Sequence, residues 1–236
     1  MISRIPKWIG DWLESSTGPR VTVLETLYIT SSVKKITFQG NVSKMDFIIG
    51  GASVIRVSET DYRNYTVAHH DIDKGIIEII FHIHGNGVGC TYINTLKTGD
   101  ELYISSPRGH RAYDPKVKQY VFFGDETTLG LACSLYAALK QNDHQFQFIF
   151  ELEEENRNAP SVLGLENHIV FAKDGSFSSE IWLKNLPLFQ SPEFKTTNFV
   201  LTGNVKSVQA LRKVLKNFNT GKILAQGYWL EGKKGL

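Results

Sequence analysis

The amino-acid sequence predicts a two-domain β + α/β protein, in which an antiparallel β-barrel is followed by a doubly wound α/β domain. The chain has 236 residues, which is room for two domains of ordinary size. Short β-branched and aromatic runs fill residues 21–106, whereas strands and helices alternate in the remainder. A loop with prolines at both ends, 107–115, separates these two parts of the chain. We therefore expect domains at 1–114 and 115–236.

Composition excludes several function classes. The net charge is +2 and no long basic run is present, which argues against a nucleic-acid partner. Two cysteines, Cys90 and Cys133, provide no disulfide framework, and we expect both to be reduced thiols. The chain shows no signal peptide and no apolar run near the ~20 residues of a membrane span. We expect a cytoplasmic protein without membrane insertion.

The first half is expected to open with a helix and continue with strands. An apolar stripe at helical spacing favours a helix that docks on the core, and its members are Ile5, Trp8, Ile9, Trp12 and Leu13. Turn signals such as 73–75 and 98–100 then separate strand-like runs. These runs are 21–29, 35–38, 47–49, 53–57, 76–83 and 101–104. Several short strands at this spacing indicate a barrel or sandwich.

The second half alternates between strands and helices. The expected strands are 120–123, 146–150, 168–172 and 198–202. The expected helices are 127–140, 178–183 and 205–217. This alternation implies right-handed crossovers and a mainly parallel sheet. Such a domain binds ligands at the carboxyl ends of its strands, so we expect the ligand site in the crevice between the two halves.

Arg63, Tyr65 and Thr66 form a short string that one cofactor could use in full. On a strand, Arg63 and Tyr65 share one face and Thr66 points away, unless a bend brings it back. A flavin dinucleotide offers a pyrophosphate for the guanidinium, a flat ring for the phenol and a ring nitrogen for the hydroxyl. The plainer alternative is an exposed arginine beside a packed tyrosine.

A glycine-rich segment, 84–89, follows about 20 residues later. Glycines let the backbone approach a ligand and point its N–H groups at an anion. If a helix begins near Cys90 and Thr91, its positive end would favour a pyrophosphate. The alternative is an ordinary glycine-rich hairpin.

Two turns in the second half suit a nucleotide. The segment 124–128, with Asp125, Glu126 and Thr127, follows a strand at the first βα turn. Gly203 lies at a later strand-to-helix turn, near where a nicotinamide or ribose would sit. Helix capping by Asp125 and Asn204 is the alternative for both turns.

Histidine spacing argues against a structural metal. His69 and His70 are adjacent and point to opposite faces of a strand, whereas His82 and His84 share a face. A pair without a third nearby ligand is a weak metal signal. Because Gly85 follows His84 directly, we interpret His84 as a flavin contact.

Taken together, these strings resemble the siderophore-interacting protein family, flavin enzymes of the ferredoxin-reductase-like superfamily. The resemblance extends from about residue 21 to residue 229. Its landmarks stand in order at 63–66, 84–87, 99–102, 107–109, 124–127, 203–213 and 227–229. It implies an FAD-binding barrel followed by an NAD(P)H-binding α/β domain.

The resemblance also implies residue roles. Arg63 would hold the FAD phosphates, while Tyr65 against the isoalloxazine and Thr66 near N5 would be the catalytic pair. A second group would line the flavin and its pyrophosphate: His84, Gly85, Gly87, Val88, Cys90 and Thr91. A third group would face the nicotinamide nucleotide: Asp125, Glu126, Thr127 and Gly203. The aromatic tail, Tyr228 and Trp229, would border the flavin.

The chain departs from the family pattern at three places. Ala68, His69 and His70 stand where the family often has basic residues, and residues 88–90 replace its usual Pro-Ala-Ser. Gly130 and Leu131 replace its Pro-Ala. FAD binding is compatible with these changes, but the basic side chains for a ferric chelate must come from elsewhere. The candidates by charge are Arg108, Arg111, Lys233 and Lys234.

The function implied is electron transfer from NAD(P)H through FAD to ferric iron in a siderophore or other ferric chelate, with release of Fe(II). One alternative is a flavin reductase or electron-transfer flavoprotein with a ferredoxin-type partner. Another is a non-enzymatic module that binds a metabolite or a partner. The sequence does not identify the siderophore, the electron donor or the oligomeric state.

Overall fold

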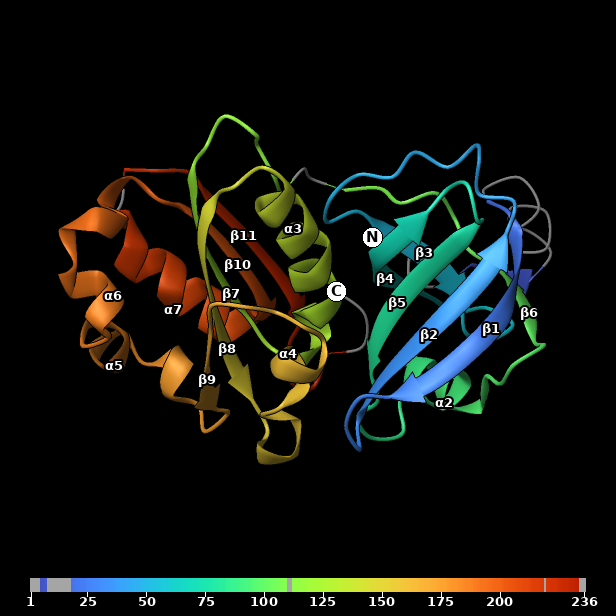
Figure 1. Ribbon diagram of the computed structural model, residues 1–236. Coiled ribbons are helices and arrows are strands. Elements are labelled where there is room, and N and C mark those ends of the chain that lie inside the picture. Colours follow the sequence, from blue (N-terminus) through green and yellow to red (C-terminus); the bar gives the residue numbers. More distant parts are fainter. Residues whose placement is uncertain (1–4, 8–17, 110–111, 219, 234–236) are drawn as a thin grey trace.

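The computed structural model describes residues 5–7, 18–109, 112–218 and 220–233, and contains two sheets side by side (Figure 1). Most of the expected N-terminal helix, residues 8–17, lies outside the described residues. In the described part of the chain, no helix is long and apolar enough to cross a membrane.

The first sheet has six strands, in the spatial order β3-β4-β5-β2-β1-β6. All neighbouring pairs are antiparallel. The sheet curls into a nearly closed barrel, where the Ser105 N–H donates to the Val54 carbonyl at 3.2 Å. The strands are β1 (Arg20–Tyr28), β2 (Val33–Gly40), β3 (Ala52–Arg56), β4 (Tyr62–Asp71), β5 (Ile76–His82) and β6 (Glu101–Tyr103).

The expected strand at 47–49 is wrong. This segment leads into a turn, because Gly50 adopts φ +79°. Phe47 instead packs flat on His70, with the ring centroids 4.1 Å apart.

Helix α2 (Val88–Thr95) lies at one end of the barrel, below β1 and β2 in Figure 1. Its Ile93 is buried in the barrel core with side chains from the strands, such as Ile36, Phe38 and Phe81. The helix begins two residues earlier than the sequence suggested, at Val88. The glycine-rich segment 84–89 therefore leads into this helix, and its last two residues form the first turn.

The second sheet is wholly parallel, in the order β11-β10-β7-β8-β9. Its strands are β7 (Gln119–Gly124), β8 (Gln145–Leu152), β9 (His168–Ala172), β10 (Asn198–Asn204) and β11 (Ile223–Trp229). Strand β11 was not predicted from the sequence, because its residues are half-buried at the sheet edge and alternate weakly.

Helices cover both faces of this sheet, which confirms the doubly wound arrangement. Helix α3 (Leu129–Gln141) packs on one face, and α7 (Val205–Lys216) with α5 (Glu180–Lys184) packs on the other. The remaining short helices lie in loops: η1 (Glu126–Thr128), η2 (Glu154–Asn156), α4 (Ala159–Val162), η3 (Ser176–Ser178), α6 (Pro187–Gln190) and η4 (Pro192–Thr196).

The two sheets share a core through α3, which lies between them in Figure 1. A Cβ on Gly130 of α3 would lie 3.0 Å from the Thr66 carbonyl oxygen, so the helix approaches β4 as closely as a glycine permits. Val33, Ala68 and Ile80 of the barrel belong to the same buried cluster as the α3 leucines. The barrel and the α/β half are thus packed together, and the division at residues 114 and 115 stays a prediction.

Candidate functional site

Arg63 and Tyr65 lie beside the start of helix α2. A Cβ on Gly89 would be 2.9 Å from the Tyr65 hydroxyl and 3.3 Å from Arg63 Cγ. Only a glycine at this position lets the helix approach both side chains so closely. The Arg63 guanidinium is half-buried and donates to the Tyr62 carbonyl at 2.8 Å.

The Tyr65 ring lies between the barrel core and α2. It meets Phe81 edge-on, with the ring centroids 4.7 Å apart. Burial raises the pKa of Tyr65, and the nearby Cys90 adds to this, while Arg63 opposes it. The phenol therefore keeps its proton at neutral pH. Because the residue is only half-buried, part of it is left for a ligand to contact.

The N-terminus of α2 has free backbone donors. Its N-cap is Gly87, no side chain caps it, and its first turn holds no acidic residue. The first intrahelical bond runs from the Thr91 N–H to the Gly87 carbonyl at 2.9 Å, so the N–H groups of residues 88–90 precede the ladder. Together with Arg63, these donors suit an anion such as a diphosphate.

The segment before α2 is held by Cys90. The His84 N–H donates to Cys90 Sγ at 3.4 Å, and the thiol donates to the His82 carbonyl at 3.7 Å. Gly85 has φ +59° with open space around its α-carbon, and Val88 is exposed at the start of α2. The predicted flavin residues of this segment thus lie together at one end of the helix.

Thr66 is on the opposite side of β4 and meets the other half of the protein. Its hydroxyl faces the phenol of Tyr228, the penultimate residue of β11. Burial raises the pKa of Tyr228, and the nearby Thr66 hydroxyl opposes this rise. Two residues that the sequence analysis placed at the flavin are thus brought together from the two halves.

Asp125 lies where the strand order reverses, between the carboxyl ends of β7 and β10. The side chain is fully buried and caps η1 by accepting from the Thr127 N–H at 2.9 Å. Its second oxygen accepts from the Asn204 N–H at 2.9 Å and from Trp229 Nε1 at 2.6 Å. Burial raises the pKa of Asp125, and Lys173 opposes this.

Gly203 leaves space for this carboxylate. Its φ is +105°, and a Cβ there would lie 2.5 Å from Asp125 Oδ2. The turn after β10 therefore needs a glycine for two independent reasons. The capping alternative from the sequence analysis describes these bonds well, and Asn204 does cap α7 by accepting from the Lys206 N–H.

Glu126 is also buried and has its own partners. Its carboxylate pairs with Lys173 at 2.5 Å and accepts from the Glu153 N–H at 2.7 Å and Asn156 Nδ2 at 3.2 Å. Burial raises the pKa of Glu126, but Lys173 outweighs it and holds the pKa below the ordinary value. Direct contact of Asp125 or Glu126 with a nucleotide would require breaking these bonds, and it stays a prediction.

Several polar residues of this edge were missed from the sequence. Lys173 follows β9 and lies 5.1 Å from the Trp229 ring. Asn156 accepts bonds from Thr30 and Ser32 of the barrel at 2.6 and 3.0 Å, and so links the two halves. Glu151 is buried near the end of β8, which raises its pKa to about 7. A single carboxylate in the apolar run 146–152 was the signal available for it.

His82 is a titratable residue of the barrel that lies near Glu126 and Lys173. Burial lowers its pKa to about 4, and its Nδ1 is a buried atom without a hydrogen-bond partner. The His82 and His84 rings are 4.9 Å apart. Among the described residues, no three His, Cys, Asp or Glu side chains are placed to hold a metal ion together.

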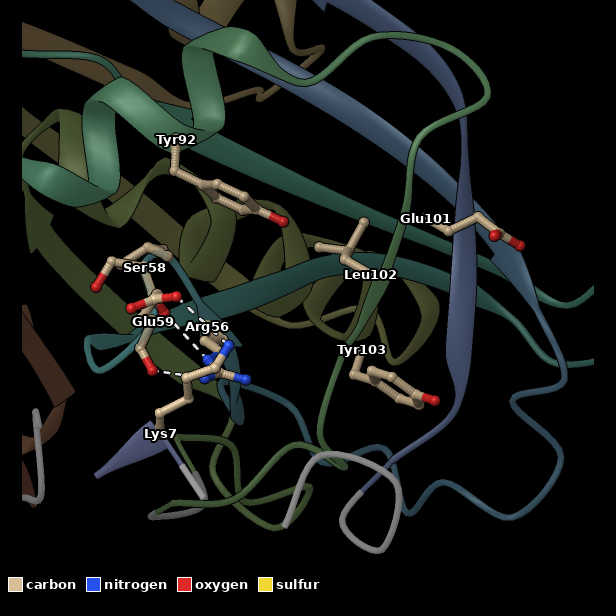
Figure 2. A pocket seen from close by; sticks show the side chains of 9 residues that line it. Lys7, Arg56, Ser58, Glu59, Tyr92, Glu101, Leu102 and Tyr103 are labelled. Carbon is tan, nitrogen blue, oxygen red and sulfur yellow. Dashed lines mark hydrogen bonds and ion pairs between the residues drawn. The ribbon is translucent and has the colours of Figure 1, made fainter. Parts of the chain in front are cut away.

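A separate cavity of about 340 Å³ opens on the barrel. Figure 2 shows Tyr92 of α2 pointing into this cavity. Arg56, Ser58 and Glu59 line one side of it, and Leu102 and Tyr103 line the other. The Arg56 guanidinium donates to the carbonyls of Ser58 and Glu59, and Lys7 pairs with Glu59 at 3.4 Å. No residue predicted for the flavin or the nucleotide lines this cavity.

Comparison with known proteins agrees with this geometry. Residues 20–113 match the family of the oxidoreductase FAD-binding domain. A search of curated proteins found no match. Among solved structures, the siderophore-interacting protein from Acinetobacter baumannii has a TM-score of 0.74 at 21% identity, covering 92% of each chain.

Two further structures show the same fold. A siderophore utilization protein from T. fusca has a TM-score of 0.74 at 21% identity, over 92% of this chain and 94% of that one. Phthalate dioxygenase reductase, described as transferring electrons from pyridine nucleotides to [2Fe-2S], has a TM-score of 0.75 at 12% identity, over 93% of this chain and 71% of that one. The chain therefore shares the two-domain fold of these structures, and residues 20–113 of its barrel half are similar to the oxidoreductase FAD-binding domain.

Proposed function

We propose that this protein is a cytoplasmic flavoprotein oxidoreductase that passes electrons from NAD(P)H through FAD to ferric iron in a siderophore, which releases the iron as Fe(II). The observation that carries the proposal is the convergence of Arg63, Tyr65 and the uncapped start of α2 at Gly89. It lies in the segment that matches the FAD-binding domain of oxidoreductases.

The residues present fit FAD. A guanidinium and three free backbone N–H groups would bind its diphosphate, and the half-buried phenol of Tyr65 would contact its ring system. Bound FAD supplies the chemistry, since a flavin accepts a hydride and can give up electrons one at a time. The protein's part is to bind, orient and shield. Thr66 has a hydroxyl for a ring nitrogen, and this hydroxyl lies beside the Tyr228 phenol.

The nucleotide is proposed to bind at the carboxyl edge of β7 and β10. Asp125 shapes this edge by tying Thr127, Asn204 and Trp229 together. The proposed contacts there are the backbone at Gly203 and the Thr127 hydroxyl oxygen, which donates its proton to Asp125 and can still accept a bond. Tyr228 would yield its place to the nicotinamide, because its phenol lies beside Thr66 at the junction of the two halves.

Arg108 is the proposed anchor for an anionic ferric chelate. Its backbone exchanges two 2.9 Å hydrogen bonds with Ala52, which pairs with Thr66 across β3 and β4. Arg108 thus lies two strand spacings, about 10 Å, from Thr66. Its side chain is exposed. Lys233 is also exposed, while Arg111 and Lys234 lie outside the described residues.

A ferredoxin-type partner is the second candidate. It is favoured by the shared fold of phthalate dioxygenase reductase and of a ferredoxin-NADP+ reductase from Plasmodium falciparum, which has a TM-score of 0.69 at 12% identity. The proposed FAD site is the same in both candidates, and they differ in which partner exchanges electrons with it.

Anaerobic turnover separates these candidates. Protein loaded with FAD is mixed with NADH, NADPH or reduced ferredoxin and an anionic ferric chelate, and Fe(II) is trapped by a chromogenic chelator. The proposal expects Fe(II) with a nicotinamide donor, and FAD must be present. If reduced ferredoxin yields Fe(II) and neither NADH nor NADPH does, the proposed electron donor is wrong. If FAD binds but no donor yields Fe(II), the ferric acceptor is wrong.

The same assay tests Arg108. Arg108→Met should raise the KM for an anionic ferric chelate about tenfold at low salt and leave turnover of a neutral quinone unchanged. The control is Arg20→Met, which removes an exposed barrel arginine paired with Glu101 at 2.7 Å. Equal KM values in the two variants would contradict the proposed role of Arg108 in binding the ferric chelate.

A further inference from the structure

Lys34 is a buried cation held by backbone carbonyls. It lies on β2 opposite Phe81, and only 2% of the residue is exposed. Its ammonium donates to three carbonyl oxygens at 3.0, 3.3 and 3.0 Å, and these belong to Ile93, Asn94 and Leu96. All three N–H groups of the ammonium are thus used.

These acceptors are the C-terminal end of α2. The last carbonyls of a helix lack partners within the helix and carry partial negative charge, so a cation there is stabilising. Here the cation comes from a different element, and it satisfies several of these carbonyls at once. Burial lowers the pKa of Lys34. The three carbonyl acceptors replace the water that the ammonium loses on burial.

Tyr28 of β1 strengthens the same attachment. Its ring lies 5.6 Å from the Lys34 ammonium, and its hydroxyl donates to Asn94 Oδ1. Two barrel strands therefore fix one end of the helix. By contrast, no side chain caps the other end, at Gly87.

The uncapped end of α2 is the one beside Arg63 and Tyr65. The helix has eight residues and is about 12 Å long. A helix this short is marginal alone and takes its direction from what holds it. The attachment at Lys34 therefore contributes, together with the Cys90 thiol and buried Ile93, to where the N–H groups of residues 88–90 lie.

We infer that Lys34 is a positioning residue for the FAD diphosphate. Its ammonium contacts the C-terminal end of α2 and not the proposed diphosphate site, and through the helix it keeps the N-terminal amides beside Arg63. The inference rests on the proposed function, because it needs the diphosphate to bind at α2.

The test compares two flavins. Apoprotein is titrated with FAD, which has the diphosphate, and with riboflavin, which has no phosphate. Lys34→Met removes the three donors at nearly equal length and should raise the Kd for FAD about tenfold. The Kd for riboflavin should change less than twofold. Hydrogen exchange at residues 88–91 should speed up while β2 stays protected.

Lys35→Met is the matched control. Lys35 is the next residue along β2, is half-buried, and pairs with Glu78 at 3.3 Å. Its loss should leave the FAD Kd unchanged. If Lys34→Met does not fold, Lys34→Gln, which keeps two N–H donors, should show a smaller FAD-selective loss.

The outcomes separate the inference from the function beneath it. If wild-type protein binds no FAD, the proposed function fails. If wild-type protein binds FAD and the Lys34 variants bind it equally well, the positioning role is overturned. Equal losses for FAD and riboflavin would also overturn it, since they would show general damage to the barrel.

Discussion

The indole N–H of Trp229 donates a 2.6 Å hydrogen bond to Oδ2 of Asp125, and so ties the last strand of the chain to its first βα turn. The carboxylate is fully buried and holds Asn204 through the same oxygen. One side chain thus joins β7, β10 and β11 at the edge proposed for the nucleotide.

Trp229→Phe should therefore destabilise the protein. It removes one donor from a buried carboxylate, and we expect a loss of about 1–3 kcal/mol in the free energy of unfolding. Urea unfolding of both single variants, Trp229→Phe and Asp125→Asn, and of the double variant measures the coupling. Strictly additive losses would show that the two residues do not interact.

Glu151 should make stability depend on pH. Burial raises its pKa from 4.5 to about 7, so the folded protein holds this proton more tightly than the unfolded chain does. Its stabilising contribution is complete below about pH 4.5 and is lost as the pH rises to 7, by up to about 3 kcal/mol. Glu151→Gln should remove this loss.

His82 has the opposite effect on the pH dependence of stability, and the Glu151→Gln variant makes this effect visible. Its pKa falls from 6.5 to about 4, so stability is lost as the pH drops through this range. Urea unfolding at pH 5, 6, 7 and 8 should show Glu151→Gln gaining stability with pH more steeply than wild type. Identical pH profiles would contradict the burial of Glu151.

Gly89→Ala should weaken FAD binding. The new Cβ would lie 2.9 Å from the Tyr65 hydroxyl, so the phenol or the helix must shift. A misfit of this size costs about 1–3 kcal/mol, which is about 5- to 150-fold in the Kd. Fluorescence titration checks it, with the melting temperature measured alongside. Unchanged affinity would mean that α2 and β4 do not jointly bind the cofactor.

Thr66→Val should reduce turnover rather than binding. The substitution keeps the side-chain shape and removes the hydroxyl beside Tyr228. Since the diphosphate contacts are untouched, the FAD Kd should stay within about threefold, while kcat falls about tenfold or more. A kcat equal to that of wild type would remove Thr66 from the catalytic pair.

The sequence predicted the architecture well because its signals are local. Turn residues divide the barrel strands, and the alternation of strands with helices produces the parallel sheet. The segment 47–49 was wrongly predicted as a strand, because a β-rich composition does not show whether a neighbouring strand is available for pairing. Strand β11 was missed because half-buried residues such as Gln226 and Tyr228 give little alternation.

The candidate site was predicted in part, and the limit is tertiary contact. Arg63, Tyr65 and the glycine segment could be grouped because strand alternation and helix termini follow from local rules. Lys34 and Lys173 could not be found this way. Each acts on a segment far along the chain, Lys34 on the end of α2 and Lys173 on Glu126. A lysine in a strand sequence gives no sign of such a partner.

The most direct measurement is calorimetric titration of apoprotein with FAD and with riboflavin, in wild type and Arg63→Met, with Arg20→Met as the control. The account predicts that wild type and Arg20→Met bind FAD equally, and that Arg63→Met loses about 10- to 100-fold for FAD and little for riboflavin. Wild-type protein that binds no FAD, or Arg63→Met that binds FAD as tightly as wild type, would contradict it.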